Sequence, residues 1–541
     1  MGKKTPEIAT RRASLSAVTS TARFDDLFTP RDLQQMTAMG LSPHEAARHV
    51  ELFRNPPPYT RVLRPCRPGD GLRALPEESY PALLAQYDAA ARRGRIGKLV
   101  PASGAATRMF QGLLSFLASP AGSGLPEEAG TLFTNLSRFP FYDDLAAALG
   151  KDGIDLETAV RRGEHRLILR YLLEDVGLGY AQLPKGLLPF HRYPEGVRTA
   201  FEEHLVEAAD VARGEDGLCL LHFTVSPQHE KGFEQLLARV RPRLEERHDC
   251  RFEVSFSFQR PATDTLAVDP ENRPFRQGDG TLLFRPGGHG ALIDNLHELG
   301  KDGWDIVLLK NVDNVLPDSR KPLAHLWKRL LGGTLLAARE RTFGHLDRLE
   351  ALDGVRGDAA EAVLREACDF LEQEISRPLP EGFHTAASPQ EKVSFLKEWL
   401  NRPLRVCGVV RNQGEPGGGP FWVESPSGGI SPQIVEPPQI DPASPEQQAI
   451  LKTSSHFNPV DIACALRDRH GRPYDLQRTV DPATVFITEK SHEGRPLKAL
   501  ERPGLWNGAM AGWNTIFVEV PDATFAPVKT VLDLLRPEHQ G

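Results

Sequence analysis

The chain has 541 residues, 40% of them hydrophobic and 25% charged, and its formal net charge at pH 7 is −7. These globular values predict a sizeable core, and the length corresponds to about three or four ordinary domains or to one elaborated core with additions. The acidic balance and the lack of a long basic stripe disfavour a nucleic-acid partner. No apolar run approaches the ~18 residues that cross a bilayer, so no membrane partner is expected.

Residues 1–24 are rich in Ser and Thr and lack the apolar segment of a signal peptide, so we expect a disordered tail. The six cysteines are scattered and form no C-x-x-C pair. This favours reduced, buried thiols over disulfides or a zinc site. Both features favour a cytoplasmic protein.

The expected elements begin with an N-terminal helical region at 25–75, in which Ser42 is a plausible helix cap with Glu45 three residues later. An apolar strand then ends near Val100 and meets small residues. Apolar side chains at helical spacing follow from Met109 to Leu117, which predicts strand, tight turn and helix. Within a core that we place at 76–400, a first helical insertion is expected at about 111–180.

From Leu218 onward, short apolar runs alternate with amphipathic segments. The pattern predicts strands at 218–224, 251–258 and 304–309 and helices at 233–240 and 291–299. This alternation favours a three-layer α/β fold, in which helices cover both faces of a doubly wound, mostly parallel sheet. A second helical insertion is expected at 333–376. Residues 401–541 continue the core with strands at 405–410 and 515–520 and a short helix from Val528.

The turn Ser103–Arg108 carries the first chemical signal. Small residues let backbone N–H groups approach a polyphosphate at a helix N-terminus, and the Arg108 guanidinium fits phosphate oxygens. The turn is neither a Walker A sequence nor G-x-G-x-x-G. Taken alone, it is explained equally well as a structural turn.

Two further features fall at strand ends, where open α/β sheets bind ligands. The loop Pro286–Gly290 precedes a helix, and Asp313 follows a strand. Together with the turn they predict a phosphate cradle, a base-recognition loop and a carboxylate for Mg²⁺, which prefers oxygen ligands. The alternatives are that Asp313 caps a turn and that Lys185, in a Pro-bounded segment, is an ordinary solvated charge.

These segments resemble motifs of the nucleotide-diphospho-sugar transferases. Val100–Phe110 resembles the signature turn of that superfamily, and Lys185–Phe190 resembles its Lys-x-x-Leu-Pro segment. Pro286–Gly290 looks like the Gly-His-Gly loop of eukaryotic-type UDP-sugar pyrophosphorylases.

Further similar segments follow in the same order, at Asp313-Asn314, Ile434–Pro437 and Phe525–Thr530. The likeness covers about residues 98–536, and the chain looks closest to a bacterial branch of the superfamily.

The resemblance implies a GT-A-like fold with helical additions and a nucleotidyltransferase. Its partners would be a nucleoside triphosphate, with UTP expected first, and a sugar 1-phosphate, and pyrophosphate would leave. Asp313 would bind Mg²⁺, while Arg108, Lys185 and Lys529 would neutralise the reacting phosphates. Glu436 would accept hydrogen bonds from sugar hydroxyls, and Asn514, just before the last strand, is a further candidate on the sugar side. The implied nucleotide contacts are Ser103, Gly104, Ala105, Thr107, Gln259, Gly288, His289 and Gly290. A monomer or small homo-oligomer is expected.

One departure from the family pattern keeps other functions open. Ala105 and Ala106 stand where family turns carry glycines, and each methyl restricts positive φ and narrows the approach of phosphates. The alternatives are a GT-A-like glycosyltransferase that uses a nucleotide sugar and a non-catalytic nucleotide-binding or sensing protein with a degenerate site. A P-loop kinase lacks its motif.

Overall fold

A computed structural model describes residues 27–120, 122–352, 357–414, 417–425 and 428–540, and the expected N-terminal tail lies outside them. Within these ranges ten strands form one central sheet. Its order is β2 (Arg67–Pro68), β3 (Gly71–Arg73), β19 (Asn514–Glu519), β12 (Leu404–Arg411), β16 (Asp461–Ala465), β11 (Ile306–Lys310), β4 (Ile96–Pro101), β7 (Leu218–Thr224) and β8 (Arg251–Ser257), with β15 (His456–Phe457) beside β12.

Neighbouring strands along this order are parallel, except that β16 runs antiparallel to both β11 and β12. Strands β4 and β11 are buried along almost their whole length, as a sheet covered on both faces requires. The predicted α/β class with a mostly parallel, mixed sheet is confirmed.

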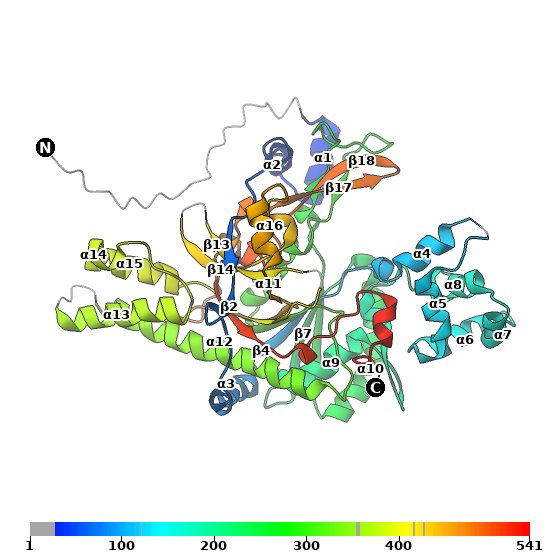
Figure 1. Cartoon of the computed structure of the whole chain (residues 1–541), viewed down its shortest axis with the longest axis horizontal. Coiled ribbons are helices and arrows are strands. Elements are labelled where there is room, and N and C mark those ends of the chain that lie inside the picture. Colours follow the sequence, from blue (N-terminus) through cyan, green and yellow to red (C-terminus); the bar gives the residue numbers. More distant parts are fainter. Residues whose placement is uncertain (1–26, 121, 353–356, 415–416, 426–427, 541) are drawn as a thin grey trace.

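Helices cover both faces of the sheet. One face packs against α3 (Tyr80–Arg92), α9 (Ala200–Val211), α10 (Glu230–His248) and α12 (Lys321–Glu350), the long helix that crosses beneath the sheet in Figure 1. The other face packs against α11 (Ile293–Lys301). Because α11 precedes the parallel strand β11, its first residues lie at the carboxyl ends of the strands.

Two helical additions lie at opposite ends of the molecule (Figure 1). The first contains α4 (Gln111–Ala118), α5 (Glu127–Thr134), α6 (Tyr142–Gly150), α7 (Leu156–Arg161) and α8 (His165–Leu173). The second contains α13 (Asp358–Gln373), α14 (Phe383–Ala386) and α15 (Pro389–Leu400). The predicted insertion at 333–376 differs from this arrangement, because α12 already begins at Lys321 and packs under β12 and β16 as part of the core.

Smaller elements complete the fold. The predicted N-terminal helices are α1 (Pro30–Met39) and α2 (Pro43–Arg54), and the Ser42 hydroxyl caps α2 by accepting the Glu45 amide at 3.1 Å. The other elements are a sheet of β1 (Val62–Pro65), β13 (Gly419–Glu424) and β14 (Ile430–Val435), helix α16 (Pro445–Lys452), and the two-stranded pairs β5 (Pro189–Tyr193) with β6 (Gly196–Thr199), β9 (Thr265–Leu266) with β10 (Phe284–Arg285), and β17 (Phe486–His492) with β18 (Arg495–Glu501).

The predicted helix from Val528 is wrong. Residues 528–530 are not helical, Thr530 is extended, and a single 3-10 segment follows at Val531–Leu535. The cause is local, because Asp533 accepts the amides of Lys529 and Thr530 at 2.8 and 2.6 Å and so caps a turn at this point.

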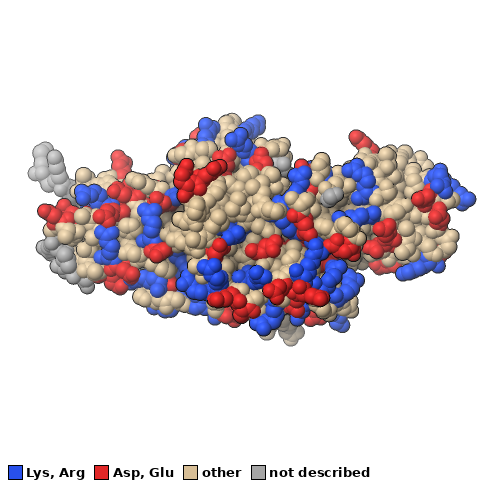
Figure 2. All heavy atoms as spheres, turned by 90° about the horizontal axis from the view of Figure 1, so that it is seen from below, with Lys and Arg blue, Asp and Glu red and all other residues tan. Residues whose placement is uncertain are grey.

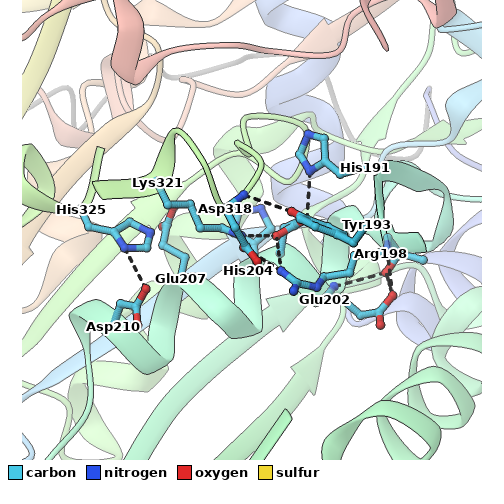
Figure 3. A network of polar contacts seen from close by, with 12 residues as sticks. His191, Tyr193, Arg198, Glu202, His204, Glu207, Asp210, Asp318, Lys321 and His325 are labelled. Atoms are coloured by element: carbon cyan, nitrogen blue, oxygen red, sulfur yellow. Dashed lines mark hydrogen bonds and ion pairs between the residues drawn. The ribbon is translucent and has the colours of Figure 1, made fainter. Parts of the chain in front are cut away.

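Helix α9 is buried although it is rich in charge (Figure 3). Glu203 accepts from Tyr193 at 2.7 Å and pairs with His191 and Lys321, while Glu207 contacts the ammonium groups of Lys98 on β4 and Lys310 on β11 at 2.7 Å each. Burial alone would raise the pKa of both glutamates, but these partners outweigh it and hold both pKa values low, that of Glu203 at about 2. Ion pairs therefore fix α9 against two central strands.

The surface shows no dominant sign of charge on the face in Figure 2, where basic and acidic side chains are interspersed. All six cysteines are unpaired thiols. Among the described residues, no helix has the length and apolar character needed to span a membrane.

One buried histidine predicts an acid-sensitive stability. His222 on β7 lies between the hydroxyls of Ser255 and Ser257, 2.7 Å from each, and burial lowers its pKa from 6.5 to about 4. The unfolded chain therefore binds more protons than the folded one below about pH 6.5, so stability falls as the pH drops toward 4. We expect this group to cost about 2 kcal/mol at pH 5 relative to neutral pH.

Thermal unfolding at pH 7 and pH 5 measures this effect. The variant His222→Gln keeps a polar partner for both serines and should lose less of its unfolding temperature on acidification than the wild type. Equal losses in the two proteins would show that His222 is not the group responsible.

Candidate functional site

The turn Ser103–Arg108 leaves β4 at the carboxyl edge of the sheet. It is fixed from below by the Ala102 amide, which donates to Thr224 O at 2.8 Å, and from the side by the Ala106 amide, which donates to Leu183 O at 2.9 Å. A short 3-10 segment (Ala106–Arg108) then leads into α4. The remaining residues of the turn, including Arg108, are exposed.

The exposed part of this turn is a row of free donors. In the described part of the chain, the amides of Ser103, Gly104, Ala105 and Thr107 have no hydrogen-bond acceptor, and the Arg108 guanidinium has neither a hydrogen bond nor an ion pair. Unpaired backbone N–H groups beside a free guanidinium attract oxyanions. The turn can therefore bind an anion without first breaking a contact.

The two alanines do not obstruct this row. Ala105 has a φ of −64°, and neither Gly104 nor any other residue of the turn has a positive φ, so no position there requires glycine. Ala106 is fully buried in the hydrophobic core, which places its methyl away from the exposed donors. The two methyl groups therefore do not strain the backbone of the turn, because neither alanine needs a positive φ.

Asp313 lies beside this turn, just after β11, and two ammonium groups hold it. Its Oδ2 is 2.8 Å from Lys185 Nζ, and Lys529 Nζ lies 3.3 and 3.1 Å from Oδ1 and Oδ2. Burial would raise the carboxyl pKa, but Lys529 and Lys185 together keep it below its usual value. Two cations and one anion give this triad a net charge of +1, which favours an anionic ligand.

Backbone contacts join the triad to the turn. An isolated bridge pairs Ala105 with Pro184, so Lys185 follows directly from the turn's neighbour. Lys185 Nζ also donates to Val528 O at 2.7 Å, and the Val528 amide donates to Asp313 O at 3.0 Å. The structure thus brings the turn, Lys185, Asp313 and Lys529 together at one sheet edge.

These residues do not form a resident metal site. Within the described ranges, no three His, Cys, Asp or Glu side chains gather as metal ligands, and both Asp313 oxygens already accept from lysines. A single carboxylate does fit a Mg²⁺ ion that arrives on a substrate phosphate, since such ions are held mainly by phosphate oxygens and water. The donor set therefore supports a metal that comes with the substrate.

The loop Pro286–Gly290 forms a second group of contacts at the same edge, before α11. Gly288 has a φ of +77°, a conformation that favours glycine. A Cβ on Gly290 would lie 2.1 Å from Pro503 O, so close packing requires glycine at position 290 as well. The glycines are explained by how the loop is built.

His289 is oriented by its neighbours. Its ring stacks on the Trp506 indole with centroids 3.9 Å apart and planes at 12°. Nδ1 accepts the Leu505 amide at 3.0 Å, so Nε2 carries the proton and faces Glu436 Oε1 at 3.6 Å. Trp506 Nε1 donates to the same carboxylate oxygen at 3.1 Å. Burial raises the pKa of Glu436, but the contacts with His289 and Trp506 hold it below its usual value.

The predicted base and sugar residues therefore meet, since His289 and Glu436 belong to one cluster through Trp506. No hydrogen bond or ion pair of the described residues joins this cluster directly to the Asp313 triad. Gln259, at the end of β8, donates to Asp264 Oδ1 at 3.1 Å, and Asp264 lies in the segment before β9.

Asn514 does not join either group. It begins β19 opposite Leu404, the first residue of the parallel strand β12, and is therefore at the amino edge of the sheet. It is buried and donates to Trp399 O at 2.9 Å. Open α/β sheets bind ligands at the carboxyl edge, where the turn, Asp313 and the loop Pro286–Gly290 lie. The position of Asn514 therefore does not support the predicted sugar contact.

Trp506 is the residue that sequence reasoning missed. It was hidden in a Gly-rich loop with no periodicity, although Gly504, two residues before it, gives a partial signal. A Cβ on Gly504 would lie 1.9 Å from Asn507 Oδ1 and 2.5 Å from His289 Cε1, so the loop closes tightly on the histidine.

Comparison with protein-family models gives a match over almost the whole chain. A family described as "Domain of unknown function (DUF4301)" matches residues 29–540. No functionally curated protein matches.

Among solved structures, a UDP-glucose pyrophosphorylase from Leishmania major is 13% identical, with 93% of this chain and 77% of that chain covered and a TM-score of 0.43. A uridine diphosphate N-acetylglucosamine pyrophosphorylase from Trypanosoma brucei is 12% identical, with 94% and 79% covered and a TM-score of 0.45. Likenesses at this level do not transfer residue roles.

Lys185 predicts a measurable link between the triad and the C-terminal segment. Lys185→Met removes one partner of the buried Asp313 carboxylate and the donor to Val528 O, and we expect a loss of about 2 kcal/mol of stability. Amide hydrogen exchange at 525–535 should become faster. The matched control is Lys231→Met, because Lys231 is exposed on α10. Unchanged exchange in Lys185→Met would refute the link.

Proposed function

We propose that this chain, which belongs to the DUF4301 family, is a nucleotidyltransferase that joins a nucleoside triphosphate to a sugar 1-phosphate and releases pyrophosphate. On this proposal it is a bacterial member of the nucleotide-diphospho-sugar transferase superfamily. One observation carries the proposal: a row of amides and the Arg108 guanidinium, which have no partner among the described residues, meet the net-positive triad of Lys185, Asp313 and Lys529 at the carboxyl edge of a mostly parallel sheet.

The chemistry needs no protein nucleophile. An oxygen of the sugar phosphate attacks the α-phosphorus in line, its bond to phosphorus forms as the bond to the β-phosphate oxygen breaks, and pyrophosphate leaves with that electron pair. The protein's task is to hold the two anions in line and to neutralise charge on the leaving oxygens. The turn and Arg108 would hold the triphosphate tail, and the two lysines would lie beside the reacting phosphates.

Mg²⁺ would enter on the triphosphate, with Asp313 as its protein carboxylate, and would supply further charge neutralisation. Recognition of the base and of the sugar would fall to the second cluster. His289 presents a fixed Nε2–H, and the Glu436 carboxylate is a strong acceptor for sugar hydroxyls. We expect UTP as the nucleotide. The six unpaired thiols support a reducing, cytoplasmic setting.

Pyrophosphate release is the deciding measurement. The purified protein is first screened by thermal shift against the four nucleoside triphosphates with Mg²⁺, because a bound ligand raises the unfolding temperature by mass action. The triphosphate that binds is then assayed with a panel of sugar 1-phosphates. Release of nucleoside diphosphate from a nucleotide sugar would instead identify a glycosyltransferase, and binding without turnover would identify a sensing protein.

Asp313→Asn tests the triad within this assay. The substitution keeps the size of the side chain but removes the charge, and we expect turnover to fall by about 100-fold or more. Circular dichroism and the unfolding temperature monitor the fold. Full Mg²⁺-dependent turnover in this variant would exclude Asp313 from the reaction.

His289→Ala tests the second cluster. We expect the KM for the nucleoside triphosphate to rise and the preference among UTP, GTP and ATP to weaken, with a smaller effect on kcat. His470→Ala, in an exposed loop, is the matched control. If the variant retains the wild-type preference, the base is recognised elsewhere.

A further inference from the structure

The two lysines of the triad hold Asp313 in different ways, and the difference bears on when a metal can bind. Resting on the proposed function, we propose that the Lys529 ammonium occupies the cation position on Asp313 in the nucleotide-free protein and is exchanged for a divalent metal when triphosphate arrives. Lys529 is then an internal stand-in for the metal, and the nucleotide must bind before or together with the ion.

The position of Lys529 Nζ is that of a bound cation. It lies 3.3 Å from Asp313 Oδ1 and 3.1 Å from Oδ2, so it bridges both oxygens of the carboxylate. Lys185 Nζ contacts Oδ2 alone, at 2.8 Å. The Lys529 ammonium therefore occupies the position from which a metal ion would contact both oxygens.

Burial separates the fixed lysine from the exchangeable one. The Lys185 side chain is 13% exposed and also donates to Val528 O, so moving it would strand a buried carbonyl. The Lys529 side chain is 48% exposed, and its ammonium has no acceptor besides Asp313 in the described part of the chain. Its loss from the carboxylate therefore costs little.

The backbone of Lys529 stays in place during such an exchange. Asp533 Oδ2 accepts the amides of Lys529 and Thr530, and the Val531 amide donates to Met109 O at 3.1 Å. Only the four-carbon side chain has to swing, and its tip can then reach a phosphate bound at the neighbouring turn.

Charge explains why the exchange needs a nucleotide. Adding a divalent ion to the resting triad would gather two ammonium groups and the metal, a total charge of +4, around a single carboxylate. Like charges at these distances repel strongly in a partly buried site. A triphosphate with a charge of about −4 reverses the balance, because it draws Lys529 to a phosphate and shares the metal with Asp313.

Metal binding without nucleotide tests the proposal. Free Mn²⁺, used in place of Mg²⁺, is titrated against each protein and measured by electron paramagnetic resonance. We expect Lys529→Met to bind Mn²⁺ about tenfold more tightly than the wild type, whereas Lys529→Arg, which keeps the cation, should match the wild type. Asp313→Asn combined with Lys529→Met should lose the gained site, and Lys231→Met should leave binding unchanged.

A second titration adds UTP without sugar phosphate. In the wild type, the affinity for Mn²⁺ should rise strongly when UTP is added. In Lys529→Met, the affinity for Mn²⁺ should already be raised before UTP is added. If Lys529→Met binds Mn²⁺ no more tightly than the wild type, the proposal is refuted. Because Lys529 is half exposed, this variant should fold, and its unfolding temperature verifies this.

The outcome is independent of the transferase assay. If no sugar phosphate yields pyrophosphate but Lys529→Met gains the Mn²⁺ site, the proposed reaction fails and the exchange stands. If pyrophosphate is formed and the Mn²⁺ affinities are equal, the reaction stands and the exchange fails.

Discussion

One carboxylate shared by two ammonium groups closes the edge of the sheet where the candidate site lies. Asp313 follows a central strand, while Lys185 and Lys529 come from segments far away in the sequence. Losing Lys185 would leave this mostly buried carboxylate without its full compensation and strand the Val528 carbonyl, which is costly, whereas the half-exposed Lys529 can leave at a lower cost. The position of the anion-binding turn relative to the C-terminal segment therefore depends on this contact.

A second layer of buried charge supports the first. Glu207 on α9 contacts Lys98 and Lys310 on neighbouring strands, and His204 Nε2 lies 3.1 Å from Val312 O, next to Asp313. Buried ion pairs tolerate few alternative arrangements, because every displaced charge must find a new partner. We interpret α9 as the element that fixes the position of the loop after β11 at the carboxyl edge of the sheet.

Much of the fold follows from periodicity, and the failures have physical reasons. Apolar runs bounded by turn residues located the parallel strands, and the Ser42 cap located a helix start, because both signals are local. The burial of helix α9 could not be predicted, because its Glu and His residues are typical of a solvated surface. They are buried only because their partners lie far away in the sequence. The C-terminal segment escaped because Asp533 caps a turn that apolar spacing alone makes look helical.

The location of the site at the edge of the sheet could be predicted, but not all of its residues. Strand ends placed Asp313 and the turn at one edge, and the structure joins them through Pro184 and Lys185. Asn514 is predicted only from its place in the chain, and polarity next to a strand does not say which end of the sheet the residue occupies. Trp506 has only the nearby Gly504 as a signal, since stacking on His289 depends on loop closure and leaves no spacing pattern.

The order of these segments along the chain sets the order in which they are synthesised and can fold. Every strand of the central sheet precedes Val528 and Lys529 in the chain, so a nascent polypeptide can assemble its sheet and its anion-binding turn before the lysine that completes the triad has been made. Completion of the triad is thereby deferred until the segment 525–535 has been made and docks across the finished edge.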